Sequence, residues 1–237
     1  GLAGKFEDPA GGQGKVTGES TVEEARDHAH AAPVPTKELA QRLQAEPRKV
    51  AWEAPAAVRD GAVLLVGLGG ASKSGKSVLA AALAARLSEQ GREAVVVEQS
   101  RYERSVGSYN CSAGVNEAMY ENPSAVNWPD FAKAIAKAAD LVAAAGSAEA
   151  PAVVIVEGTL VFHMPQICEA FGRRLFLRAS RQEVLKRRQG TAPLADPFVE
   201  HVFWPMHLQY GQPQAPWEDL RVEDGEDGHP VPEALLS

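Results

Sequence analysis

One short segment, residues 70–77 with the sequence GASKSGKS, constrains the fold more than any other part of the chain. It fits the pattern G-x-x-x-x-G-K-[ST] and lies between an apolar run, 62–68, and a stretch of helical composition, 77–90. Glycine allows tight turns in which consecutive backbone N–H groups point inward, and the start of the following helix adds positive potential. The segment is therefore predicted to grip a polyphosphate. The residues expected to bind it are Gly70, Ala71, Ser72, Lys73, Ser74, Gly75, Lys76 and Ser77.

The two residues that end this segment have separate expected roles. Lys76 is expected to reach the β- and γ-phosphates of ATP, and the hydroxyl of Ser77 is expected to bind Mg²⁺. A dinucleotide-binding reading, from Gly67-x-Gly69-Gly70 with Glu98 as a ribose ligand, is the weaker alternative because it gives Lys76 and Ser77 no role.

Apolar runs and helical stretches alternate through the middle of the chain. Strands are predicted at 62–68, 94–99, 151–158 and 173–179, and helices at 77–90, 128–145, 180–189 and 197–210. Gly91, Asn127 and the pair Ser180 and Glu183 are predicted to cap three of these helices. This alternation indicates an α/β P-loop NTPase fold, a three-layer sandwich in which helices cover both faces of a parallel sheet.

Composition divides the chain into three parts. Residues 1–60 hold few large apolar side chains and are expected to form an extended arm with little core. Residues 61–222 form the expected kinase-like domain, and 223–237 an acidic, solvated tail.

The charge and cysteine content narrow the classes of function. The formal net charge is −7 and no basic block occurs, so an extended nucleic-acid surface is not expected. No apolar run is long enough for a transmembrane segment. The two cysteines, Cys111 and Cys168, match no metal-ligand spacing and are expected to be free thiols in a reducing, intracellular compartment. His201 and His207 are six residues apart on a predicted helix and are not expected to share a face or a metal.

Several segments together resemble the nicotinamide riboside kinases, small enzymes related to uridine kinases. The resemblance rests on GLGGASKSGKSVLA, VVIVEGTLVF, LKRR and DPFVEHVFWPMHLQY, within about 62–210. It implies transfer of a phosphoryl group from ATP, with Mg²⁺, to the 5′-hydroxyl of a nucleoside. It further implies that Glu157 lies near the metal and the substrate hydroxyl, that Tyr120 and Glu121 bind the nucleoside, and that Arg187, with Lys186 and Arg188, begins a lid over the phosphates.

The chain departs from the family pattern at the catalytic base. The family's Asp after the second strand is replaced by Ser100, and a serine hydroxyl is far too weak a base at neutral pH. Glu98 is a possible substitute, because strand alternation would place it on the same face as Ser100. The lid segment after Arg188 is also shorter than the family's, so activity is doubtful.

Two functions follow from different classes. The first is a nicotinamide-riboside-kinase-like enzyme of the cytosol with ATP and Mg²⁺ as cofactors. The second is an inactive kinase-fold accessory subunit of a large assembly, anchored through residues 1–60. A chain that starts at Gly1, without Met, is compatible with a cleaved leader, so the mitochondrial matrix is the expected place for the second.

Overall fold

The computed structural model describes residues 51–104, 108–110, 116–118, 122–189, 198–211 and 220–224. All of them fall within one compact unit, Val34–Ser237. The strands are β1 (Val63–Gly70), β2 (Ala94–Glu98), β3 (Ser108–Asn110), β4 (Asn116–Ala118), β5 (Ala152–Gly158), β6 (Arg173–Arg178) and β7 (Leu220–Asp224). The α-helices are α3 (Ala56–Arg59), α4 (Lys76–Glu89), α5 (Trp128–Val142), α6 (Pro165–Glu169), α7 (Arg181–Gln189) and α9 (Trp204–Met206).

Five short helical turns complete the described elements. Three are 3₁₀ turns: η1 (Gln99–Tyr102), η2 (Pro123–Ala125) and η3 (Ala143–Ala145). Two are π-helical turns, η4 (Val199–Phe203) and η5 (His207–Gly211), and they flank α9. No described helix is both long and apolar enough to cross a membrane.

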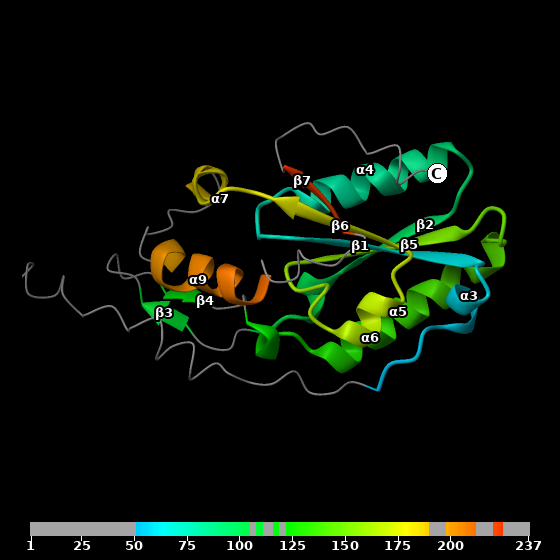
Figure 1. Ribbon diagram of the computed structural model, residues 1–237, viewed down its shortest axis with the longest axis horizontal. Coiled ribbons are helices and arrows are strands. Elements are labelled where there is room, and N and C mark those ends of the chain that lie inside the picture. Colours follow the sequence, from blue (N-terminus) through cyan, green and yellow to red (C-terminus); the bar gives the residue numbers. More distant parts are fainter. Residues whose placement is uncertain are drawn as a thin grey trace, which may run out of the picture. The chain divides into compact units, whose positions relative to one another are not determined.

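The main sheet has five parallel strands in the order β2-β5-β1-β6-β7, and β3 and β4 pair antiparallel in a separate hairpin (Figure 1). Parallel strands need crossover connections, and α4 provides the first of them, from β1 to β2, which lies two places away in the sheet. β1 lies at the centre of the sheet because it is apolar along its whole length and almost wholly buried. The loop that follows β1 therefore emerges between two strand ends, where α/β proteins bind ligands.

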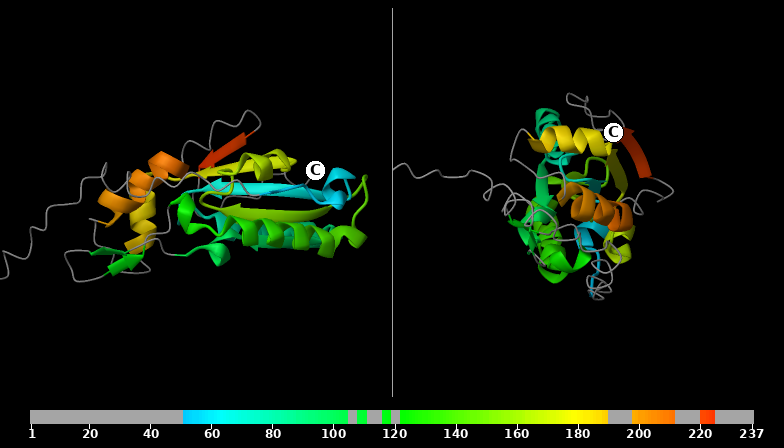
Figure 2. Two further views of the ribbon diagram at one scale, coloured as in Figure 1. Left: turned by 90° about the horizontal axis from the view of Figure 1, so that it is seen from below. Right: turned by 90° about the vertical axis from the view of Figure 1, so that its left-hand side faces the viewer.

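Helices cover both faces of this sheet (Figures 1 and 2). On one face, Leu79, Leu83 and Leu87 of α4 pack against apolar side chains of the strands. On the other face, Phe131 and Ile135 of α5 pack against a second set of strand residues, and both are fully buried. The structure thus confirms the predicted three-layer α/β sandwich.

The predicted helix caps are confirmed in position, and two of the three in mechanism. After α4, Gly91 has a φ of 76°, and Arg92 N donates to Leu87 O in a Schellman motif. Before α7, Ser180 N donates to the Glu183 carboxylate and Glu183 N donates to Ser180 Oγ, which is a capping box. Asn127 precedes α5 but makes no side-chain cap, because its amide donates to Asp130 instead.

The first boundary of the expected domain needs correction. The last ten residues of the expected arm contribute to the core, because Trp52, Ala57 and Val58 pack against the α5 face of the sheet. The folded region therefore starts before Gly61, while residues 1–50 lie outside the described part.

The second boundary also moves. β7 pairs in parallel with β6 and runs to Asp224, so the start of the expected acidic tail extends the sheet. Its acidic residues made this segment look like a solvated tail. It can nevertheless pair as a strand, because parallel pairing uses backbone groups and does not depend on these side chains.

Candidate active site

The segment 70–77 forms a loop that joins the central strand to the first long helix. β1 ends at Gly70 and α4 begins at Lys76, and Ser74 N donates to Ala71 O within the loop at 3.1 Å. Gly75 precedes α4 with a φ of 102°, a left-handed conformation that side chains rarely adopt. At Gly70, a Cβ atom would lie 2.4 Å from the carbonyl oxygen of Leu177 on β6. Glycine at both ends therefore allows the loop to turn tightly against the sheet.

Lys76 is turned into this loop. Its side chain is 7% exposed, and its Nζ donates to the carbonyl oxygen of Ala71 at 2.8 Å. Since the first N–H groups of a helix have no partner within the helix, those at the start of α4 add donors beside the ammonium. A buried cation next to aligned donors is the chemistry that a polyphosphate requires.

Ser77, the next residue, is linked to the carboxyl end of a neighbouring strand. Its Oγ donates to Glu157 Oε1 at 2.9 Å, and Glu157 is 4% exposed near the end of β5. β5 pairs with β1 in a register that places Glu157 beside Leu68, two residues before the loop begins. The strand register therefore brings a hydroxyl and a carboxylate together at the start of α4, which is compatible with the place that the family resemblance implies for Glu157.

This donor set fits ATP with Mg²⁺. Among the residues described, no group of three or more His, Cys, Asp or Glu side chains gathers in a way that could hold a metal by itself. Mg²⁺ is commonly held by one or two carboxylates together with substrate phosphates and water, rather than by an all-protein cage. Ser77 and Glu157 supply that partial set beside a phosphate loop, so they are suited to hold the metal of a metal–nucleotide complex.

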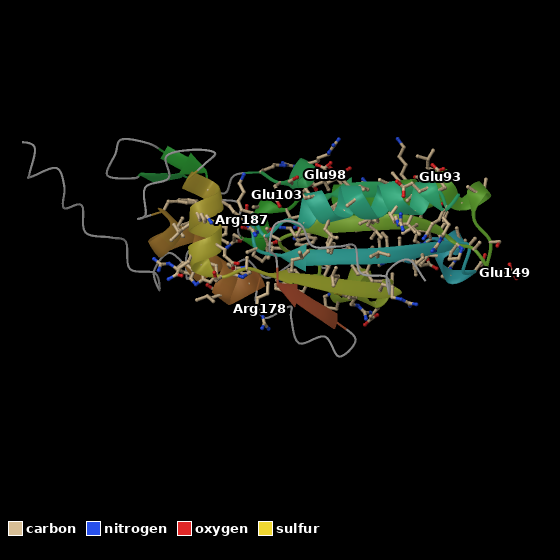
Figure 3. All side chains as sticks on the ribbon, turned by 90° about the horizontal axis from the view of Figure 1, so that it is seen from above. Glu93, Glu98, Glu103, Glu149, Arg178 and Arg187 are labelled. Atoms are coloured by element: carbon tan, nitrogen blue, oxygen red, sulfur yellow. The ribbon has the colours of Figure 1, made fainter. Side chains whose placement is uncertain are left out.

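The three basic residues at the end of α7 lie in different environments. Arg187 extends from α7 (Figure 3), and its Nη1 donates to the carbonyl oxygen of Lys73 in the phosphate loop at 2.9 Å. Lys73 has a φ of 65°, a left-handed conformation that is uncommon for a residue with a side chain. Lys186 is exposed, whereas the Arg188 guanidinium lies over the rings of Phe198 and Phe203. Of the three expected lid residues, the structure brings Arg187 to the loop.

The carboxyl end of β2 differs from the expected arrangement. β2 ends at Glu98, and Ser100 lies in the 3₁₀ turn η1, where it is exposed. Strand alternation therefore does not relate the two residues, and the prediction that they share a strand face was wrong. Glu98, which Figure 3 labels, instead pairs in register with Glu157 on β5. Its carboxylate accepts a hydrogen bond from Arg101 at 2.8 Å.

Gln99, between these two residues, has a structural position. It is fully buried, and its Oε1 accepts a hydrogen bond from Leu160 N at 3.0 Å. A Cβ on Gly158 would lie 1.9 Å from that oxygen, so glycine is required there for the contact. Gln99 thus links the turn after β2 to the turn after β5. This link sets the position of the next residue, Ser100.

A small cavity lies beside the phosphate loop, and no sequence pattern predicts it. It has a volume of about 220 Å³, including its open mouth, and Ser72, Thr159 and His207 are its polar lining residues. His207 is 9% exposed, and burial, together with the positive charge of Lys76, lowers the pKa of this histidine to about 4. The two π-helical turns around α9 also depart from the 3.6-residue spacing that was used to judge whether His201 and His207 share a face.

Several other predicted residues do not enter this site or fall outside the described part. Tyr120 and Glu121, the expected nucleoside contacts, and Cys111 all lie outside the described residues. Cys168 is a buried free thiol, as predicted, and its Sγ donates to Phe162 O.

Comparison with known proteins gives a weak similarity in sequence. A uridine kinase of Bacillus anthracis is 26% identical over 94 residues, which are 36% of this chain and 44% of that enzyme. The match therefore spans less than half the length of the curated relative. No protein-family model matches the chain.

Solved structures with a similar arrangement have low sequence identity. A putative fructose transport system kinase from Silicibacter covers 78% of this chain and 96% of its own, with 16% identity and a TM-score of 0.47. A possible uridine kinase from Bacillus stearothermophilus covers 84% of this chain and 99% of its own, with 14% identity and a TM-score of 0.40. The sheet order, the layers and the loop between β1 and α4 show that the chain has the α/β fold of P-loop nucleotide-binding proteins.

Proposed function

We propose that this protein binds ATP with Mg²⁺ and transfers the γ-phosphoryl group to a hydroxyl of a small molecule, with a nucleoside as the acceptor. The observation that carries the proposal is the junction of the buried Lys76 ammonium with the Ser77–Glu157 pair at the N-terminus of α4. The partial similarity to a uridine kinase supports a nucleoside as acceptor. The 5′-hydroxyl of nicotinamide riboside is the specific acceptor suggested by the resemblance of sequence segments.

The proposed roles follow from position. Lys76 would bind the β- and γ-phosphates, while Ser77 and Glu157 would hold Mg²⁺. Mg²⁺ held there would neutralise part of the phosphate charge. Arg187 anchors α7 to the loop through Lys73 O, and places a guanidinium near the transferred group. The acceptor oxygen bonds to the γ-phosphorus, the bond from that phosphorus to the β–γ bridging oxygen breaks, ADP leaves, and the hydroxyl proton passes to water.

The expected turnover is low. The described residues at the end of β2 offer an exposed serine and a carboxylate already paired with Arg101, rather than a free carboxylate facing the loop. General-base catalysis is typically worth about 10²–10⁴-fold, and phosphoryl transfer depends mainly on positioning and charge. The protein is therefore expected to be a slow kinase rather than an inert one.

The test measures product directly. The purified chain is incubated with ATP, Mg²⁺ and either uridine, cytidine or nicotinamide riboside, and nucleoside monophosphate is quantified by mass spectrometry, with Lys76→Ala as the blank. We expect a monophosphate to form at less than about 1 s⁻¹, below the range of about 1–100 s⁻¹ typical of kinases. No monophosphate above the blank with any of the three nucleosides would contradict the nucleoside kinase proposal.

An inactive accessory subunit is the second candidate, and the exposed Ser100 favours the loss of activity that it requires. Its assembly through residues 1–60 and its place in the mitochondrial matrix rest on the sequence, since residues 1–50 lie outside the described part. Turnover within the typical kinase range would contradict this candidate.

A further inference from the structure

The cavity beside the phosphate loop is formed where three parts of the chain meet. Ser72 comes from the loop itself, Thr159 and Leu160 follow β5, and Phe203, Met206 and His207 come from the segment around α9. The loop residue places the cavity next to the proposed polyphosphate site. The residues after β5 place it at the carboxyl ends of the strands, where ligands bind in such sheets.

We propose that this cavity receives the hydroxyl-bearing end of the acceptor and that His207 hydrogen-bonds that hydroxyl. The inference rests on the proposed function, because it names the acceptor side of the same site. An acceptor must approach the γ-phosphoryl group from outside the loop, and Ser72 brings the cavity to the loop's edge. Apart from its open mouth, the cavity encloses only about 10 Å³, enough for about one water molecule or one hydroxyl group, so it takes only the hydroxyl end of the acceptor.

The lining selects an uncharged hydroxyl. Leu160, Phe203 and Met206 supply apolar walls, and the Ser72 and Thr159 side chains carry neutral hydroxyl groups. His207 is neutral at pH 7, since burial and the charge of Lys76 lower the pKa of this histidine to about 4. A neutral imidazole both donates and accepts hydrogen bonds, and therefore matches a hydroxyl. A carboxylate in this cavity would lie against apolar walls and would lose its hydration without a cationic partner on the cavity lining.

His207 is held in place by its neighbours. Its ring lies 5.2 Å from the Trp204 ring, and a Cβ on Gly211 would come within 2.5 Å of His207 Nδ1. Glycine at 211 therefore leaves the space that the imidazole fills. With a pKa near 4, His207 is a weak base, so its role is to bind and orient the hydroxyl rather than to remove its proton.

The test separates acceptor binding from nucleotide binding. Calorimetry measures the affinities of β,γ-imido-ATP with Mg²⁺, and then of uridine and nicotinamide riboside added to that complex. The measurements compare the unsubstituted protein with His207→Phe and His207→Gln. His163→Phe is the matched control, because His163 is also partly buried with a pKa lowered by burial, but stacks on Trp128 outside the cavity.

We expect His207→Phe to weaken nucleoside binding about tenfold while the affinity for β,γ-imido-ATP stays within twofold, because one hydrogen bond is lost. His207→Gln, which retains a donor and an acceptor, is expected to recover most of that affinity, and His163→Phe to leave it unchanged. Equal nucleoside binding by His207→Phe, parallel loss of both ligands, or binding of β,γ-imido-ATP without either nucleoside would overturn the inference. Failure of the unsubstituted protein to bind β,γ-imido-ATP would instead overturn the proposed function on which it rests.

Discussion

The carboxyl ends of β5 and β2 are neighbours in the sheet, yet they are built differently. Near the end of β5, Glu157 is buried and bonded to Ser77 of the phosphate loop. Beside it, at the end of β2, Glu98 pairs with Arg101 near the surface and Ser100 is exposed. Removing charged groups from water is costly unless they are paired. Glu157 therefore needs its partner Ser77, whereas the groups at the end of β2 remain in contact with water. The proposed nucleotide side of the site is assembled, whereas the base that the sequence resemblance implies for the proposed acceptor side is absent from the described residues at the end of β2.

The largest expected effect is a loss of nucleotide affinity when Lys76 is replaced. Lys76→Ala removes a buried ammonium from the loop, and truncating one partner of a buried charge contact costs about 2–5 kcal/mol. We expect the affinity for β,γ-imido-ATP with Mg²⁺ to fall about 100-fold, as measured by calorimetry. Lys186→Ala, at an exposed lysine, is the control and should leave the affinity within twofold. An unchanged affinity in Lys76→Ala would place the nucleotide elsewhere.

Acid is expected to destabilise the folded protein through His207. The pKa of His207 is about 4 in the folded protein and about 6.5 in an unfolded chain, so the unfolded chain binds more protons between these values. Stability from this residue is therefore present above pH 6.5 and is lost as the pH falls toward 4. The free energy of unfolding should fall by about 3 kcal/mol over that range. Denaturant unfolding at several pH values should show this loss reduced in His207→Gln, and equal losses in both proteins would contradict the assignment.

A carboxylate swap compares the two strand ends directly. Glu157→Gln keeps the shape of the side chain but weakens the metal site, and changes at such sites typically cost about 10–100-fold. We expect the gain in nucleotide affinity from Mg²⁺ to shrink by about that factor. Glu98→Gln, at the adjacent and only partly buried position, should leave the gain unchanged. If both variants lost the Mg²⁺-dependent gain in nucleotide affinity equally, the two strand ends would be equivalent and the assignment of the metal to Glu157 would be wrong.

The smallest expected effect is a gain in activity when a carboxylate is restored at Ser100, on the proposed acceptor side. Ser100→Asp supplies a carboxylate where the sequence resemblance expects a base, and it should raise nucleoside monophosphate formation about tenfold, below the full effect of a well-placed base. Ser100→Asn controls for side-chain size. An Asp variant no faster than the Asn variant would show that Ser100 does not occupy the position of a base.

The fold was largely predictable because its central elements have strong local signals. β1 and β5 are continuous apolar runs, and Gly91 and the Ser180–Glu183 pair stop and start helices by their own backbone and side-chain bonds. β7 was not foreseen, because its pairing uses backbone groups while its side chains include acidic residues.

The site was predictable only where a motif specified it. Lys76 and Ser77 follow from the loop pattern, whereas Glu157 was implied by the resemblance to the nicotinamide riboside kinases and agrees with its place at a strand end. His207 was missed because its place depends on how the segment around α9 packs beside the phosphate loop and the turn after β5, which local sequence does not show. The end of β2 was misjudged because a 3₁₀ turn replaces the strand one residue before Ser100, an effect of the buried Gln99 contact that local sequence does not reveal.

The central claim is that the loop between β1 and α4 binds a nucleoside triphosphate. Its most direct test is a calorimetric titration of the unsubstituted protein with β,γ-imido-ATP, with Mg²⁺ and then with the metal chelated. The account predicts saturable one-to-one binding that weakens at least about tenfold without Mg²⁺, because Ser77 and Glu157 are placed to hold the metal. No binding, or binding of equal strength with and without Mg²⁺, would contradict it.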